Sequence, residues 1–368
     1  MKKLGFGLMR LPYSEDKTWG NVDLEKTRDM IDSYMKEGFT YFDTAWVYHG
    51  GFSEKIFGEL VGKRYPRNEF QVTTKMPLWG MKDSSELQKI FDEQLKNCHV
   101  DYFDYYFLHA LNKEIYKKAE DFGGFQWMQK MKAAGKIKHP GFSFHDSADV
   151  LEEILNAHPE VELVQLQINY IDWESNNVQS RKCYEVCCRH GVQVSVMEPI
   201  KGGSLANITD EGRKYFNKIN PEASLASWAV RYCASLDNIL VVLSGMSNME
   251  QLKDNMSYMK YFVPLSGKEQ KAVKKTARFI EKTIAIPCTA CRYCVDGCPK
   301  KINIPRYFEL YNEQNRYGVQ SYTWHYNEEK KNGGSPADCI SCGACQRHCP
   351  QKLNIVDLLK EVKKTFEA

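Results

Sequence analysis

The sequence lacks three features that would assign it to other classes of protein. No stretch approaches 18 uninterrupted apolar residues, so we expect no membrane-spanning helix and no membrane partner. Lys and Arg alternate with Asp and Glu and the formal net charge is only +3, so we expect no nucleic-acid partner. No G-x-G-x-x-G motif opens a helix after an early strand, which disfavours an open dinucleotide-binding sheet.

The start of the chain also lacks the features of a signal peptide. The segment MKKLGFGLMRLP has two lysines but neither a long apolar run nor a small-residue cleavage site. We therefore expect a cytoplasmic protein. In that compartment the thirteen cysteines indicate metal ligands or free thiols, because disulfides are rare there.

Length and composition predict two domains. The 368 residues exceed one ordinary domain, and 43% hydrophobic with 26% charged residues is typical of a globular protein with a real core. Eight of the thirteen cysteines lie beyond residue 287, in two runs of four. We therefore predict a first domain over residues 1–280 and a second, cysteine-rich domain over residues 281–368.

Short apolar segments alternate with longer amphipathic ones over the first 262 residues. Apolar residues recur every three or four positions in the amphipathic segments, which predicts helices there, including 22–38, 84–98, 147–158 and 222–235. The short apolar segments are predicted strands. Eight strands, each followed by a helix, predict an α/β fold, a (β/α)8 TIM barrel. The predicted strands are 2–9, 40–45, 70–75, 102–110, 139–144, 163–170, 192–199 and 239–246.

Polar residues stand at the carboxyl ends of these strands, where the active sites of such barrels lie. We expect them to converge at one mouth of the barrel. They are Asp43, Tyr48, Lys75, His109, Ser143, Gln167, Asn169, Glu198, Lys201, Ser244, Gly245 and Ser247.

These residues occur in seven motifs that resemble the aldo-keto reductase family. The motifs follow the family's order from residue 1 to about residue 262. They are DTAWVY, TTKMP, DYFDYYFLHAL, GFSFHD, QLQINY, EPIKGG and SGMSNMEQLKDN. The resemblance implies reduction of an aldehyde or ketone, a small carbonyl substrate, by NADP(H) or NAD(H).

A tetrad of Asp43, Tyr48, Lys75 and His109 carries the predicted chemistry. Hydride delivery to a carbonyl develops an alkoxide, which needs a proton donor and a positive field. We assign the proton donor to Tyr48 and expect Lys75 to lower the phenol's pKa from its ordinary value of about 10. Asp43 would orient Lys75, and His109 would orient the carbonyl oxygen or share the proton transfer.

The resemblance also implies a set of cofactor-binding residues. Ser143 and Gln167 match groups that hydrogen-bond the nicotinamide carboxamide. The turn before the helix at residue 249 would hold phosphate on backbone N–H groups, although the same pattern also describes an ordinary N-cap. The residues assigned to the cofactor are Ser143, Gln167, Met197, Lys201, Ser244, Gly245, Ser247, Gln251 and Asn255.

Three departures from the family leave the choice between NADPH and NADH open. Phe144 stands where an Asn is usual, and Met197 replaces an aromatic ring that stacks on the nicotinamide. Gly245 and Gln251 stand in the positions of basic residues that bind a 2′-phosphate. Lys201 or Lys253 could compensate.

The two cysteine runs, CTACRYCVDGCP and CISCGACQRHCP, share the spacing C-x-x-C-x-x-C-x-x-x-C-P. This spacing is the signature of bacterial two-cluster ferredoxins, in which the fourth cysteine of each run ligates the other cluster, whereas zinc motifs use paired ligands. The long segment between the runs predicts a mainly α-helical ferredoxin-like domain. We assign Cys288, Cys291, Cys294 and Cys349 to one [4Fe-4S] cluster, and Cys339, Cys342, Cys345 and Cys298 to the other.

The clusters leave the function of the whole chain open between several alternatives. Splitting a hydride into single electrons is a step usually given to a flavin, and no clear flavin motif is present. The clusters could support the fold only, or they could pass electrons to a ferredoxin or another electron-transfer partner. A separate alternative is a redox-coupling enzyme that passes electrons between a nicotinamide or flavin and ferredoxin through its clusters. A third alternative is a non-enzymatic, nicotinamide-binding redox sensor, against which the intact tetrad argues.

Overall fold

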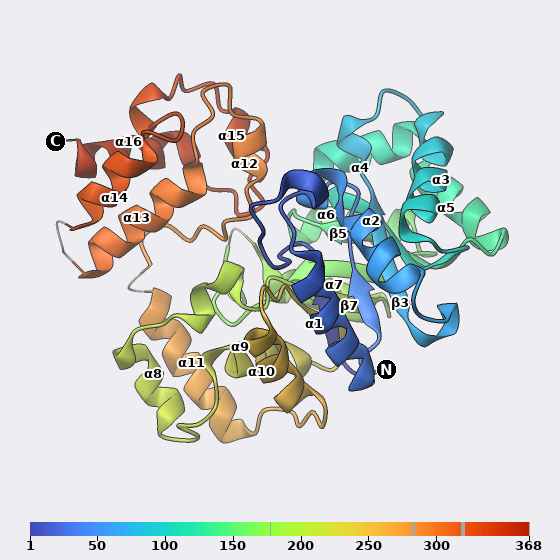
Figure 1. Ribbon diagram of the computed structural model, residues 1–368, viewed down its shortest axis with the longest axis horizontal. Helices are drawn as coiled ribbons and strands as arrows, with labels where there is room; N and C mark the ends of the chain where they lie inside the picture. The colour runs from blue at the N-terminus through green and yellow to red at the C-terminus, as the bar shows by residue number, and fades with distance from the viewer. Residues whose placement is uncertain (177, 282–283, 318–320, 368) are drawn as a thin grey trace. The chain divides into compact units, whose positions relative to one another are not determined.

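The computed structural model describes residues 1–176, 178–281, 284–317 and 321–367 (Figure 1). These residues form two compact units. The first comprises residues 1–174, 179–199 and 226–267, and the second comprises residues 175–178, 200–225 and 268–368. The units do not follow the predicted domains 1–280 and 281–368 residue for residue, and that boundary stays a prediction.

The first unit contains a closed barrel of eight parallel strands in sequential order, which confirms the predicted fold. The register places Asp43 beside Thr73 and Lys75 beside Phe107. The strands are β1 (Leu4–Gly7), β2 (Tyr41–Asp43), β3 (Gln71–Met76), β4 (Phe103–Leu111), β5 (Ile137–Phe144), β6 (Leu163–Gln167), β7 (Gln193–Met197) and β8 (Ile239–Ser244).

The helices of this unit bury one apolar face and expose the other. In α1 the Asp23 side chain caps the helix by accepting the Lys26 N–H, and Thr27, Ile31 and Tyr34 lie on the buried face. The four segments predicted as helices begin and end within three residues of their predicted bounds. The helices are α1 (Leu24–Lys36), α2 (Ser53–Phe57), α3 (Glu86–Cys98), α4 (Lys113–Asp121), α5 (Gly124–Ala133), α6 (Ala148–Ala157), α7 (Ser180–Arg189), α9 (Leu225–Ala234) and α10 (Met249–Met259).

Five short helical turns complete the first unit. They are Lys17–Trp19, Tyr48–Gly51, Gly58–Gly62, Arg67–Glu69 and Leu78–Gly80. Within the described part of the chain, no helix combines the length and the hydropathy that crossing a bilayer would require.

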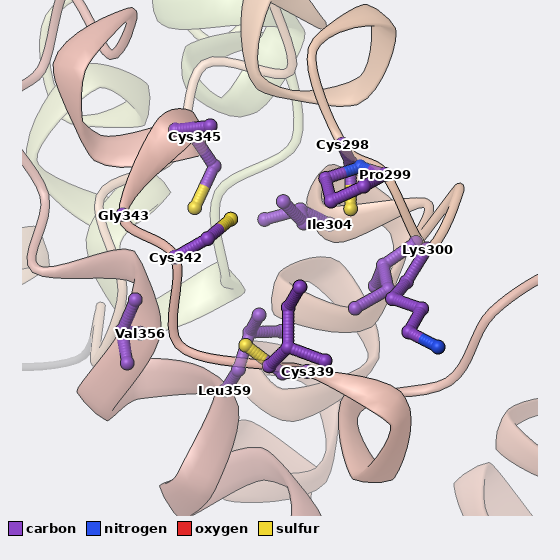
Figure 2. Close-up of a pocket in the computed structure, with 13 residues that line it drawn as sticks. Cys298, Pro299, Lys300, Ile304, Cys339, Cys342, Gly343, Cys345, Val356 and Leu359 are labelled. Atoms are coloured by element: carbon purple, nitrogen blue, oxygen red, sulfur yellow. The ribbon is translucent and has the colours of Figure 1, made fainter.

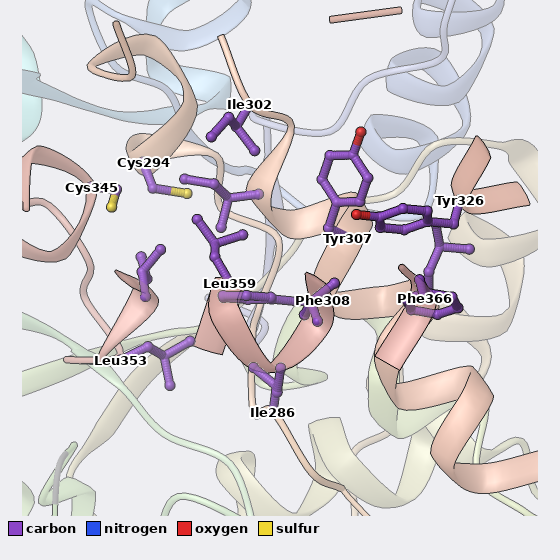
Figure 3. Packing of buried hydrophobic residues seen from close by; sticks show 14 residues of the cluster. Ile286, Cys294, Ile302, Tyr307, Phe308, Tyr326, Cys345, Leu353, Leu359 and Phe366 are labelled. Carbon is purple, nitrogen blue, oxygen red and sulfur yellow. The ribbon is translucent and has the colours of Figure 1, made fainter. Parts of the chain in front are cut away.

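The second unit is mainly α-helical, as predicted. Figure 3 shows its core, in which the Tyr326 and Phe366 rings stack with centroids 4.7 Å apart. Phe308, Tyr326 and Leu359 are buried there, and each such side chain contributes about 1.5–3 kcal/mol. Gly318, the last residue of the predicted helical segment between the cysteine runs, lies outside the described residues. The elements are α8 (Asp210–Asn217), α11 (Gly267–Glu281), α12 (Tyr293–Asp296), α13 (Ile304–Tyr317), α14 (Ser321–Glu329), α15 (Ala344–Arg347), α16 (Ile355–Phe366) and two short turns, Lys201–Ala206 and Pro336–Asp338.

Candidate active site and candidate iron-sulfur centres

A buried ion pair joins the ends of β2 and β3. The Lys75 ammonium donates to Asp43 Oδ1 at 2.7 Å and to the carbonyl oxygen of Thr44 at 2.7 Å. Gln165 holds the other carboxylate oxygen of Asp43 through its Nε2 atom at 3.1 Å. Because the Lys75 side chain is fully buried, these bonds offset the cost of removing both charges from water.

Three rings lie around this ion pair. The Lys75 ammonium is 5.0 Å from the centroid of the Tyr48 ring, and the Tyr48 and His109 rings meet edge to face at 6.0 Å. Trp79, which follows β3, lies 4.9 Å from the His109 ring and is 38% exposed. The structure therefore brings the four predicted tetrad residues together and adds Trp79, which the sequence analysis missed although it lies in the run KMPLWG.

The expected lowering of the Tyr48 pKa is wrong for this structure. Burial raises the pKa of Tyr48 well above its ordinary value, and the charges of Asp43 and Glu198 raise it further. The Lys75 ammonium, which is hydrogen-bonded to Asp43 and Thr44, does not outweigh these effects. Among the described residues, no hydrogen bond joins the Lys75 amine to the Tyr48 hydroxyl.

His109 is held as a neutral imidazole. Burial lowers its pKa well below the ordinary value, and the Lys75 charge lowers it further. Its Nδ1 atom is buried and has no hydrogen-bond partner in the part of the chain that the structure describes. A buried polar atom without a partner, beside an exposed indole, is the arrangement expected where a bound ligand completes the site.

A second buried carboxyl group lies behind Lys75. Glu54 Oε1 accepts the Thr74 hydroxyl at 2.5 Å and the Gln94 amide at 2.7 Å, and the same amide donates to the Lys75 carbonyl oxygen at 3.0 Å. Tyr106 donates to Gln94 Oε1 at 2.5 Å. Burial raises the pKa of Glu54 to about 7. No local pattern in the sequence indicates this network, because its members are separated by up to 52 positions in the chain.

The residues assigned to the nicotinamide lie at the ends of β5, β6 and β7. Ser143 Oγ accepts the Ala110 N–H at 2.7 Å, and the Gln167 amide donates to Asp172 at 2.7 Å. Met197 is the last residue of β7 and is partly exposed. The carboxamide contacts that the resemblance implies stay predictions.

The segment between β8 and α10 forms a complete N-cap. The Asn248 side chain accepts the Gln251 N–H at 2.8 Å, and Gln251 Oε1 accepts the Ser247 N–H at 2.8 Å. Asn255 Nδ2 donates to Ser244 Oγ at 2.8 Å. The ordinary N-cap interpretation is therefore satisfied, and phosphate would have to displace the Gln251 side chain to reach the Ser247 amide.

Arg10 supplies a cation beside this segment. A Cβ added to Gly245 would lie 3.0 Å from the Arg10 side chain, and the Ser247 hydroxyl donates to the Arg10 carbonyl oxygen at 2.9 Å. The Arg10 guanidinium is 3.8 Å from Glu198. Because Gly245 has no side chain, the Arg10 cation, which comes from the loop after β1, has space beside it. No local motif in the sequence indicates this contact.

Lys201 belongs to the second unit, unlike the other residues assigned to the cofactor. It is buried and has a left-handed backbone with φ 47°. The following Gly202, with φ 66°, packs against the first cysteine run, because an added Cβ would lie 2.2 Å from the Thr289 carbonyl oxygen. Only glycine fits this close approach.

Each predicted cysteine quartet borders one cavity. Cys288, Cys291, Cys294 and Cys349 line one cavity. The other cavity is lined by Cys298, Cys339, Cys342 and Cys345, whose side chains surround it in Figure 2. Each cavity is thus lined by three cysteines of one run and the fourth cysteine of the other run, which is the crossed arrangement that the spacing predicts.

The two cysteine runs have matching backbones. Ala290 and Ser341 have φ 53° and 57°, and Arg292 and Gly343 have φ 69° and 70°. Left-handed residues without a glycine cost about 1–2 kcal/mol each, and such turns direct successive N–H groups into an anion-binding hollow. The Ala290 N–H already donates to Cys288 Sγ at 3.4 Å.

The thiols in each cavity disfavour one another's ionisation. Burial raises the pKa of Cys294, and the charges of Cys291, Cys288 and Cys349 raise it further. Burial likewise raises the pKa of Cys345, with Cys339 as the next cause. Iron relieves this repulsion by binding thiolates, so four thiols, an anion-binding backbone and a cavity together fit an iron-sulfur cluster. Within the described ranges no three His, Cys, Asp or Glu residues are grouped to hold a single ion.

The remaining five cysteines lie in helices of the barrel unit. Four of them are buried and pack in the core, whereas Cys188 is exposed on α7. The buried ones are Cys98, Cys183, Cys187 and Cys233.

Comparisons with known proteins agree with this geometry. Residues 3–278 match the Aldo/keto reductase family, and residues 287–353 match the 4Fe-4S dicluster domain. The chain is 25% identical over 306 residues to L-galactose dehydrogenase of Arabidopsis thaliana, covering 76% of this chain and 90% of that protein. It is 21% identical over 300 residues to a probable voltage-gated potassium channel subunit beta of the same plant, covering 69% and 88%.

Solved structures share the barrel. A thermostable aldo-keto reductase, Tm1743, superimposes with a TM-score of 0.61 at 22% identity, covering 74% of this chain and 94% of that one. An aldo-keto reductase from Klebsiella pneumoniae in complex with NADPH gives a TM-score of 0.58 at 18% identity, covering 74% and 90%. The chain therefore belongs to the aldo/keto reductase family and is an NAD(P)-dependent oxidoreductase that carries a 4Fe-4S dicluster domain.

Proposed function

We propose that the barrel reduces a small aldehyde or ketone, with Tyr48 as the proton donor. The observation that carries this proposal is the Lys75–Asp43 ion pair beside the Tyr48 ring, with His109 facing the same ring. A bound nicotinamide supplies the hydride. The solved Klebsiella relative contains NADPH, and we propose NADP(H) or NAD(H) for this chain.

Tyr48, Lys75 and His109 have different roles in the proposed reaction. With its pKa raised, Tyr48 keeps its proton at neutral pH and gives it up only to a stronger base, which the alkoxide is. Lys75 then stabilises the phenolate that is left. A neutral His109 suits hydrogen bonding to the carbonyl oxygen better than proton donation.

Electron exchange through the two clusters is a second candidate function. The observation that favours it is the exposure of Cys342, which would bring one cluster close to solvent. Support of the fold alone, without electron transfer, is the competing explanation, although the second unit also has a hydrophobic core of its own.

The Tyr48→Phe variant tests the main proposal. We expect the rate constant for carbonyl reduction to fall about 10²–10⁴-fold, because one proton donor is removed, while the Kd for NADPH measured by fluorescence stays within twofold. The matched control is Tyr105→Phe, which removes a hydroxyl from β4 where the ring stacks on His139. Because relatives include an L-galactose dehydrogenase and a glyoxal reductase, the substrate panel should include an aldose and an α-dicarbonyl. Full activity of Tyr48→Phe would overturn the assignment.

A further inference from the structure

The second cysteine run has an exposed apolar edge. Of the eight cysteines in the two runs, Cys342 is the one that is exposed. Ile340, beside Cys339, is 58% exposed and lines the same cavity. We call residues Ile340, Ser341 and Cys342 the cluster edge. The cluster edge thus places a large apolar side chain in water beside two predicted metal ligands, Cys339 and Cys342.

Cations surround the cluster edge. Lys300 lines the cavity and is exposed, and Lys301 follows it on the surface. The Arg347 guanidinium, also exposed, donates to the Cys342 carbonyl oxygen at 3.4 Å.

Nearby carboxylates only partly compensate these cations. Asp338 caps its own turn by accepting the N–H and O–H groups of Ser335 at 2.7 and 2.8 Å. Asp296 is the exposed carboxylate on α12.

The first quartet has no comparable surface. None of Cys288, Cys291, Cys294 and Cys349 is exposed, and the Thr289 backbone between the first two is covered by Gly202. The turn at α12 connects the quartets, because Cys294 lines one cavity and Cys298 the other. The second quartet is therefore the one suited to contact with an external molecule.

We propose that the cluster edge is the docking surface for a small acidic protein that carries one electron at a time. An apolar centre with a charged rim is the usual anatomy of a protein interface, and opposite charge steers the encounter. With a cluster held by Cys298, Cys339, Cys342 and Cys345, one encounter would transfer one electron between the carrier and that cluster, so that one is oxidised and the other reduced by one electron. The proposal rests on the second candidate function and names its partner.

The test uses the intact holoprotein under anaerobic conditions and a purified acidic flavodoxin as the probe. Calorimetry gives the Kd, and the loss of cluster absorbance after mixing with reduced flavodoxin gives the second-order rate constant. In the double variant Lys300→Glu/Lys301→Glu we expect binding and rate to fall at least about tenfold at low salt and the salt dependence to disappear. The matched control, Lys363→Glu/Lys364→Glu on the last turn of α16, makes the same change of charge.

Iron content and the visible spectrum verify that every variant keeps its clusters. Equal behaviour of the two double variants, or no binding of flavodoxin to the wild type, would overturn the docking proposal. Binding that depends on Lys300 and Lys301 without electron transfer would uphold the docking surface and reject electron exchange as its function. Basic cytochrome c serves as a second probe. If the rate constant for its reaction with the wild type falls with salt as steeply as the rate constant for flavodoxin does, the proposed docking surface for an acidic partner would be rejected.

Discussion

Replacing Glu54 with Gln should remove a large part of the protein's pH dependence of stability. The Glu54 carboxyl group is buried behind Lys75 and accepts hydrogen bonds from Thr74 and Gln94. A glutamine oxygen can accept the bonds from Thr74 and Gln94, so the variant keeps these two contacts and removes the ionisation; Asn97 is a third partner of the Glu54 carboxyl group. The perturbation therefore isolates the cost of a buried charge.

The sign and size follow from the raised pKa of Glu54. Burial raises it from 4.5 to about 7, so the folded state holds the proton more tightly than the unfolded state does. Stability from this group is fully present below pH 4.5 and is lost as the pH rises to about 7. At about 1.4 kcal/mol per pKa unit, the loss amounts to about 3 kcal/mol. Because part of this loss has already occurred at pH 5, the variant should gain about 2.5 kcal/mol relative to the wild type between pH 5 and pH 8.

Anaerobic urea unfolding, followed by tryptophan fluorescence, measures this difference at each pH. Comparing variant and wild type under the same conditions cancels the contributions of other titrating groups. Glu59→Gln, one turn farther along, changes a half-exposed carboxylate and should show no such trend. A stability difference between Glu54→Gln and wild type that stays constant from pH 5 to pH 8 would refute the reasoning.

Two further predictions concern the second unit. The Gly202→Ala variant should release iron to a chelator about tenfold faster or more, because its Cβ would meet the Thr289 carbonyl oxygen at 2.2 Å. The control is Gly203→Ala, which also has a positive φ but has open space around the added Cβ. Equal rates of iron release in the two variants would contradict the proposed contact. Cys349→Ser should lower the iron content from about eight to about four atoms per chain. Adding Cys288→Ser should cause no further loss, adding Cys339→Ser should remove the rest, and the opposite pattern would reject the crossed ligand sets.

Features with a short-range signal were predictable from the sequence. The eight strands are continuous apolar runs because both faces of each are covered, and all eight were placed. The crossed cysteine assignment was predictable because the spacing C-x-x-C-x-x-C-x-x-x-C-P is the signature of two-cluster ferredoxins, in which the fourth cysteine ligates the other cluster. The convergence of Asp43 and Lys75 was also predicted, since parallel strands bring their carboxyl ends to one edge.

Features that depend on distant parts of the chain could not be predicted. The high pKa of Tyr48 results from burial and from Glu198, which lies 150 positions away in the chain. The cation beside Gly245 comes from Arg10, and no motif joins the two positions. The place of Lys201 in the second unit depends on the contact of Gly202 with another loop, which has no local signal.

The exchange of one cysteine between the two runs has a consequence for how the protein matures. A growing chain that has reached residue 340 contains the whole first run, yet neither cavity then has its four thiols, because one needs Cys349 and the other needs Cys342 and Cys345. The second quartet is complete only once Cys345 has been made, and the first only once Cys349 has been made. Both sites therefore become available almost together, four residues apart in synthesis.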